Sequence, residues 1–170
     1  MDIIMVALRI PKKLREKLAE LGLDVESEVI EKLFTEARLD PVEEAEARLE
    51  LAERFLEGAR GYVERGDAVQ ASAKLYKVAE ECVKALATKF NAPELEESRR
   101  RGRWMTWLLG RAARTLAEKL GEPKIEFIWG VAYDLHVWGF HEAKYGVDMV
   151  RVDVPHLEWL LNHAKKIFKE

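Results

Sequence analysis

The chain has 170 residues, of which 48% are hydrophobic and 35% are charged. This length and composition predict one domain with its own core and a small appendage. The single cysteine, Cys82, excludes an internal disulfide and a cysteine-based zinc site. The chain has no signal peptide and no apolar run long enough to span a membrane, so we expect a soluble, cytoplasmic protein without a membrane partner. Many charges with few side-chain amides are typical of thermophile proteins.

The charge is unevenly distributed along the chain. The net charge is −3, yet residues 99–170 carry 13 basic and 9 acidic side chains. A basic surplus in one region lets an acidic protein keep an anion-binding surface.

The first forty residues predict a strand followed by two short helices. Residues 3–10 are rich in Ile, Val and Leu and end at Pro11, which favours a strand. One helix follows up to Gly22, and a second is predicted from Val25 to about Arg38, with Asp24 as its N-cap. The segments LRIPKKLREKL and DVESEVIEKLF, in this order, resemble the ribbon-helix-helix family. That resemblance implies an arm, residues 1–40, whose strand pairs with the strand of a second copy in a homodimer.

In the resembling family, the outward side chains of the paired strands read DNA bases. Strand alternation divides the residues into an outward set (Met5, Ala7 and Arg9) and a core-facing set (Val6, Leu8 and Ile10). Two apolar side chains and one arginine are a poor set for reading bases. Acidic residues at the start of the second helix, Asp24, Glu26 and Glu28, would repel a phosphate. We therefore favour dimerisation, and DNA binding through the arm is the alternative.

Residues 41–170 predict an all-α, antiparallel up-and-down helical bundle. Apolar residues recur every three or four positions from Pro41 to about Arg65 and from Ala68 to about Phe90. The short connection between these two helices makes them antiparallel neighbours. Further helices are expected from about Arg103 to Leu120, from Pro123 towards Gly139, and from Asp153 onwards, and residues 91–98 are expected to form a loop or short turn. Trp104 and Trp107 are expected in the core.

Two phrases of the sequence are more specific. GDAVQASAKLYKVAEECVKALA at 66–87 and LHVWGFHE at 135–142 resemble the two signatures of the archaeal PaREP family. The resemblance extends over nearly the whole chain and brings no assigned activity with it. It also suggests a relation to HEPN-type helical bundles, which include metal-independent ribonucleases and nucleotide-associated subunits.

The candidate catalytic residues are His136, His141 and Glu142. On an unbroken α-helix, a step of five residues turns about 140° around the axis, so the two histidines would not share a face. A helical zinc pair uses a four-residue step, and we therefore expect no metal and no cofactor. The HEPN resemblance implies an arginine followed, after four to six residues, by a histidine. His141 matches that histidine, while His136 stands in place of the arginine.

Two histidines can still serve as base and acid in an attack by a ribose 2′-hydroxyl. The alternative is a purely structural role, in which His136 is a hydrogen-bonded core residue and Glu142 orients His141. A literal match to the implied motif runs from Arg151 to His156. It crosses a predicted loop-to-helix junction, so we rank it below His136 and His141.

A basic cluster beside tryptophans is the candidate anion or nucleic-acid site: Arg99, Arg100, Arg101 and Arg103, with Arg151 as a further candidate. Arginines beside aromatic rings bind phosphates and stack on bases. The alternative is local ion pairing with Glu94, Glu96 and Glu97. Taken together, the sequence predicts an interaction or nucleic-acid-associated module, by family analogy of a toxin–antitoxin or defence kind, with RNA or another polyanion as candidate partner. The alternatives are a metal-independent ribonuclease and a DNA-binding regulator.

Overall fold

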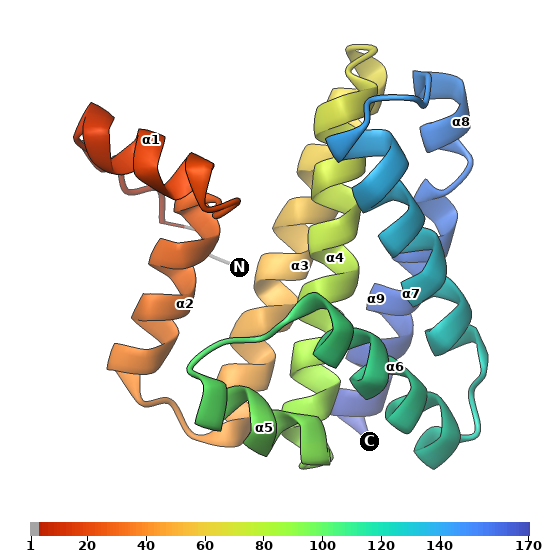
Figure 1. The fold of residues 1–170 in the computed structure, drawn as a ribbon. Helices are drawn as coiled ribbons and strands as arrows, with labels where there is room; N and C mark the ends of the chain where they lie inside the picture. The colour runs from red at the N-terminus through yellow and green to blue at the C-terminus, as the bar shows by residue number, and fades with distance from the viewer. Residues whose placement is uncertain (1–3) are drawn as a thin grey trace. The chain divides into compact units, whose positions relative to one another are not determined.

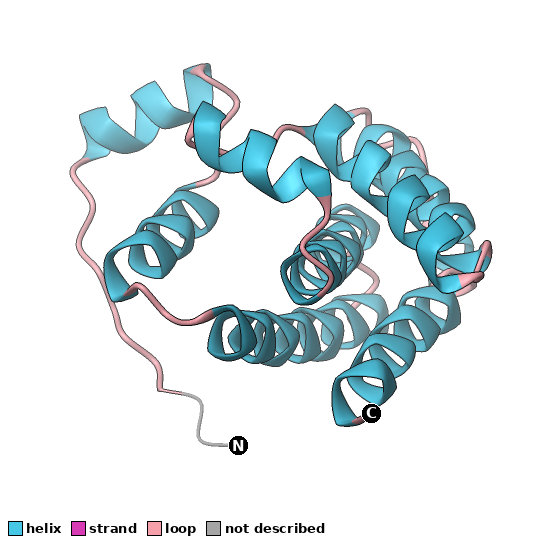
Figure 2. Ribbon diagram, turned by 90° about the horizontal axis from the view of Figure 1, so that it is seen from below, coloured by secondary structure: helices cyan, strands magenta, loops and turns pink. Residues whose placement is uncertain are grey.

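The computed structural model describes residues 4–170, which form helices and connecting loops (Figure 2). The prediction of an all-α protein is confirmed. In chain order the elements are α1 (Lys12–Glu20), α2 (Val25–Ala37), α3 (Pro41–Glu64), α4 (Ala68–Lys89), α5 (Pro93–Arg101), α6 (Thr106–Leu120), α7 (Lys124–Asp134), the π-helix η1 (Leu135–His141), α8 (Val147–Arg151) and α9 (Val154–Lys169). They separate into two compact units, Met1–Leu39 and Asp40–Glu170. No helix among the described residues is long and apolar enough to cross a membrane.

The second unit is built around α4. This helix contacts α3, α5, α6, α7, η1, α8 and α9, and Figure 1 shows it beside α3 within the bundle. Every residue from Glu81 to Thr88 is buried, because a helix enclosed by others has no solvent-facing side. The predicted apolar stripe of α3 is buried as expected: Ala45, Leu49, Ala52, Leu56, Ala59 and Val63.

Local sequence explains where the two long helices begin. Asp40 accepts hydrogen bonds from the backbone N–H groups of Val42 and Glu43, and the Glu43 carboxylate returns a contact to the Asp40 N–H. This capping box satisfies N–H groups that the helix itself leaves unpaired. Asp67 caps α4 through the N–H of Gln70, directly after a turn at Gly66, whose φ is +77°.

The predicted N-terminal strand is wrong for the residues that the structure describes. Residues 4–10 form no strand, because they have no ladder partner among residues 4–170. Residue 3 lies outside the described part. Val6 and Leu8, expected to face a core, are 73% and 58% exposed.

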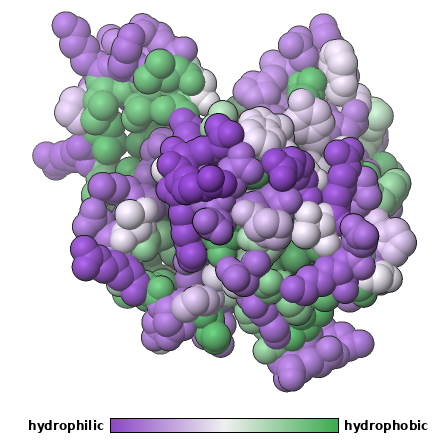
Figure 3. All heavy atoms as spheres, turned by 60° about the horizontal axis from the view of Figure 1, so that its bottom comes forward, coloured by the Kyte–Doolittle hydropathy of each residue, from purple (hydrophilic) through white to green (hydrophobic). Residues whose placement is uncertain are grey.

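The two arm helices also contribute no buried residue. Leu33 of α2 is 61% exposed, although it is a large apolar residue. Figure 3 shows apolar side chains gathered on the surface of this unit.

Two further predictions in the second unit are corrected. Residues 91–98 were expected to form a loop, but Pro93 opens α5, as proline at the first position of a helix favours. The next helix begins at Thr106 rather than near Arg103. Trp107, in the first turn of this helix, is 46% exposed instead of buried.

Candidate functional site

The histidine pair lies on a π-helix that continues directly from α7. The chain remains helical through Gly139, where the sequence predicted the helical pattern to break, and η1 ends at His141. The N–H of Glu142 donates to the carbonyl of Val137, 2.9 Å away, which is an i→i+5 bond. In this wider turn, residues five apart become neighbours along the axis. The Nε2 atoms of His136 and His141 consequently lie 3.1 Å apart.

Close packing against α4 accounts for the position of η1. A Cβ atom on Gly139 would lie 2.2 Å from Oγ and 2.7 Å from Cβ of Ser72, so no larger residue fits there. Ser72 is fully buried, and its hydroxyl has no hydrogen-bond partner in the described structure. The wide turn and the missing side chain together let the backbone of η1 approach the α4 surface.

His136 is held by aromatic contacts. Its ring stacks on Tyr76 of α4, with centroids 4.1 Å apart and planes inclined by 24°. Burial lowers the pKa of His136 to about 4, and the neighbouring His141 acts in the same direction. Burial also raises the pKa of the Tyr76 phenol far above its usual value. Both rings are therefore neutral near pH 7.

His141 and Glu142 are more accessible than His136. His141 is exposed and meets the edge of the His136 ring, with centroids 4.4 Å apart and planes at 83°. Glu142 is also exposed, and its carboxylate makes no hydrogen bond or ion pair within residues 4–170. The structure thus brings the two histidines together, while Glu142 contributes the backbone N–H that closes the π-turn.

Charged residues of α3 and α4 form an ion network, and one of them, Glu80, acts electrostatically on His136. Arg48 of α3 donates to Glu81 at 2.9 Å and also contacts Glu44. Lys84 is 2% exposed and donates to Glu80 at 2.9 Å. Burial by itself would raise the pKa of Glu80, but its ion pairs with Lys84 and Lys77 lower that pKa to about 2. The Glu80 charge partly offsets the effects that lower the pKa of His136.

The α4 residues of this site were not predicted from the sequence. Ser72, Tyr76, Glu80 and Lys84 recur every four positions within the 66–87 phrase. On a helix this spacing forms a stripe along one face, and polar groups in an otherwise apolar helix mark a special environment. This polar stripe was the feature of the sequence from which the α4 side of the site could have been predicted.

The arginine cluster forms a separate feature on α5 and the loop after it. Arg99, Arg100 and Arg101 make up the last turn of α5, where basic residues suit the helix dipole. Arg101 pairs with Glu97 at 2.9 Å and lies over the Trp107 ring, so part of the cluster is paired locally. Arg103 follows the helix and is exposed. Arg151 ends α8, is exposed, and makes no hydrogen bond or ion pair within residues 4–170.

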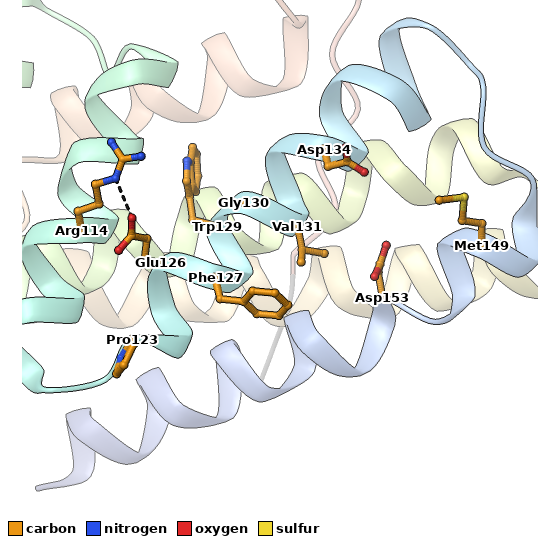
Figure 4. A pocket seen from close by; sticks show the side chains of 10 residues that line it. All are labelled: Arg114, Pro123, Glu126, Phe127, Trp129, Gly130, Val131, Asp134, Met149 and Asp153. Atoms are coloured by element: carbon orange, nitrogen blue, oxygen red, sulfur yellow. Dashed lines mark hydrogen bonds and ion pairs between the residues drawn. The ribbon is translucent and has the colours of Figure 1, made fainter.

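An open groove of about 730 Å³ runs along the outer side of α7 (Figure 4). Phe127, Val131 and Met149 supply apolar surface, and an Arg114–Glu126 ion pair of 2.8 Å lies near one end. Neither histidine of the pair lines the groove. Two histidine rings meet at η1, 3.1 Å apart, and we therefore place the candidate site there rather than in this groove.

Comparison with known proteins assigns the family. The sequence profile of the archaeal PaREP1/PaREP8 family matches residues 47–161. The chain belongs to this family. The PaREP1/PaREP8 chain is also similar to a Sulfolobus solfataricus protein of known crystal structure, at 32% identity and a TM-score of 0.63, over 70% of this chain and 96% of that one. No curated protein matches it.

The two phrases that resemble the PaREP signatures meet in space. The first lies on α4 and the second on η1, and these elements are in contact. Tyr76 from the first phrase stacks on His136 from the second, and Ser72 faces Gly139. Two segments far apart in the sequence, both within the matched residues 47–161, therefore build the candidate site together.

Proposed function

We propose that this PaREP1/PaREP8 protein is a HEPN-like, nucleic-acid-associated bundle that cleaves RNA without a metal ion. The observation that carries the proposal is the 3.1 Å contact between the Nε2 atoms of His136 and His141. The His136 ring is half-buried and the His141 ring is exposed, which suits a reactive group held by a positioning group. By analogy with HEPN bundles, such an activity belongs to a toxin–antitoxin or defence system.

The environments of the two rings divide their roles. His136 is neutral because burial lowers its pKa to about 4, so its Nε2 can accept the N–H of His141. That hydrogen bond leaves Nδ1 of His141 as a free base at the surface. The short separation leaves no room for a phosphate between the Nε2 atoms. His136 is accordingly a positioning residue, and His141 is the catalytic residue.

The reaction is an internal transfer at phosphorus. Nδ1 of His141 takes the proton of a ribose 2′-hydroxyl, and the 2′-oxygen forms a bond to the adjacent phosphorus. The bond from phosphorus to the 5′-oxygen breaks, and the imidazolium of His141 returns its proton to that oxygen. The products are a 2′,3′-cyclic phosphate and a 5′-hydroxyl end. Hydrogen bonding to His136 stabilises the His141 cation between the two proton transfers.

The arginines of α5 support an RNA partner. Arg99 and Arg100 are exposed at the end of α5, next to the Arg101–Trp107 stack. Guanidinium groups bind phosphates in pairs of hydrogen bonds, and their contribution weakens as salt rises. We assign Arg99, Arg100 and Arg103 to substrate binding, and Arg151 to the same role as a further exposed arginine.

The test is cleavage of a short single-stranded RNA by the full chain in the presence of EDTA. We expect cyclic-phosphate products from the wild type, a loss of at least about 100-fold in rate for His141→Ala, and a smaller loss for His136→Gln. The matched control is His163→Ala, which removes a histidine that stacks on Trp159 of α9. An RNA with a single 2′-deoxy nucleotide at the scissile position must resist cleavage. The proposal is contradicted if wild type and His141→Ala cleave the RNA at equal rates, or if neither cleaves it.

The arm supports a second proposal, a homodimer. Its helices contribute no buried residue, and Ile4, Met5, Val6 and Leu8 are between 58% and 83% exposed. A contiguous exposed apolar surface of this kind marks an interaction site, and pairing of residues 4–10 with a second copy would cover it. Light scattering should show a dimer for the full chain and a monomer after removal of residues 1–39. Salt-dependent binding to duplex DNA that disappears with the same truncation would favour the DNA-binding alternative instead.

A further inference from the structure

The histidine pair has a geometry that also suits a metal ion. When a transition metal lies about 2.0–2.1 Å from two imidazole nitrogens, those atoms are about 2.9 Å apart at a 90° angle and about 3.3–3.4 Å apart at 109°. The Nε2 atoms of His136 and His141 are 3.1 Å apart, between these two values. We propose that His136 and His141 chelate a divalent late transition metal, and that Cu²⁺ binds most tightly of the series.

The π-turn creates this chelate. In an α-helix, residues five apart point in directions about 140° apart, which would prevent joint coordination. The i→i+5 turn of η1 instead places both rings on one side. Tyr76 stacks on His136 and restrains that ring before any metal arrives. Little side-chain entropy is therefore lost on binding, which favours affinity.

The ligand type selects the metal. Neutral imidazole nitrogens suit Cu²⁺, Ni²⁺ and Zn²⁺, and affinity along the divalent series is highest for Cu²⁺. No group of three or more His, Cys, Asp or Glu side chains among the described residues could hold the ion. The remaining coordination positions are therefore left to water or to an added anion.

Binding requires a change of tautomer in the pair. In the metal-free hydrogen bond, one ring carries a hydrogen on Nε2 and the other accepts it. The metal needs both Nε2 lone pairs, so the donor ring moves its hydrogen to Nδ1. The two rings remain neutral, and the shared hydrogen bond is replaced by two metal–nitrogen bonds.

This inference goes beyond the proposed RNA cleavage and does not depend on it. Both use His141, and metal binding moves the hydrogen of that ring to Nδ1, the atom that acts as the base in the proposed reaction. Metal occupancy is accordingly expected to inhibit cleavage. Copper binding is measured without RNA, so failure of one proposal is distinguishable from failure of the other.

The experiment is a titration of the full, tag-free chain with Cu²⁺, followed by calorimetry and electron paramagnetic resonance. We expect one tight site per chain, with coupling to two equivalent nitrogens. His141→Ala should weaken that site at least tenfold and remove one nitrogen from the spectrum. Because His141 is exposed, its substitution should leave the fold intact, as circular dichroism will check.

Two controls make the result specific. His163→Ala and His156→Ala remove the other two histidines of the chain, and both should retain the wild-type site. The proposal is overturned if His141→Ala binds Cu²⁺ as tightly as wild type, or if either control variant loses the site to the same degree. A spectrum with a single coupled nitrogen in wild type also overturns it.

Discussion

Replacing Gly139 with alanine tests how η1 depends on α4. The new methyl group would lie 2.2 Å from Ser72 Oγ and 2.7 Å from Ser72 Cβ, whereas ordinary contacts begin near 3.4 Å. The Cβ of Ser72 is attached directly to the α4 backbone, so the clash cannot be relieved by rotating a flexible side chain. The backbone of η1 must move instead.

The expected cost follows from two opposing effects. Overpacking of a close interface costs about 1–3 kcal/mol, and a shortfall of about 1.2 Å against the Oγ atom places this site at the upper end of that range. Alanine returns about 1 kcal/mol through its better helix propensity. We expect a net loss of about 1–2 kcal/mol in the free energy of unfolding, together with separation of the two histidine rings.

Urea unfolding of matched variants provides the measurement. Gly58 also lies within a helix, α3, and a Cβ there would meet nothing within 4 Å. Gly58→Ala should therefore stabilise the protein by about 0.5–1 kcal/mol. Ser72→Gly should offset part of the Gly139→Ala loss in the double variant, which a double-mutant cycle measures. If Gly139→Ala is as stable as Gly58→Ala, the tight packing inferred for η1 is wrong.

Three other predictions concern the charges of the second unit. The pKa of Glu80 falls from 4.5 to about 2 on folding. The ionised carboxylate therefore stabilises the folded state fully above about pH 4.5, and this contribution is lost as the pH falls towards 2. In urea unfolding across that pH range, Glu80→Gln should remove up to about 3 kcal/mol of the pH dependence of the free energy of unfolding. Arg48→Met removes the 2.9 Å partner of buried Glu81 and leaves it only Lys84, 3.7 Å away. The variant should lose up to about 3–5 kcal/mol, whereas adding Glu81→Leu should recover most of the loss; equal stability of the single and double variants would refute the pairing. Arg99→Gln should weaken RNA binding and reduce the slope of log affinity against log salt by about 0.7, and an unchanged slope would show that Arg99 does not contact phosphate.

Much of the fold could be predicted because the relevant signals are local. The steps of three and four residues in α3 and α4, the caps at Asp40 and Asp67, and the turn at Gly66 all depend on residues near in sequence. Burial of the α3 stripe follows once two amphipathic helices face each other. The strand predicted at residues 4–10 is wrong because a strand is not specified locally. It needs a hydrogen-bonding partner that its own sequence does not supply.

Only the histidine side of the candidate site could be predicted from the sequence. The phrase at 135–142 identified His136 and His141, but α-helical geometry placed them on different faces. The stripe formed by Ser72, Tyr76 and Glu80 was present in the sequence without any indication of what it would face.

The sequence by itself determined the helical class, the long α3–α4 pair and the two histidines as the residues of interest. Only the tertiary structure decided that these histidines touch. A π-turn costs hydrogen-bond regularity, and local propensity alone does not favour it. It forms here because Gly139 meets Ser72 of α4 with no space for a side chain, and because Tyr76 provides a ring against which His136 stacks. Both contacts come from residues sixty or more positions away, so the register of the turn is set by packing and not by its own sequence.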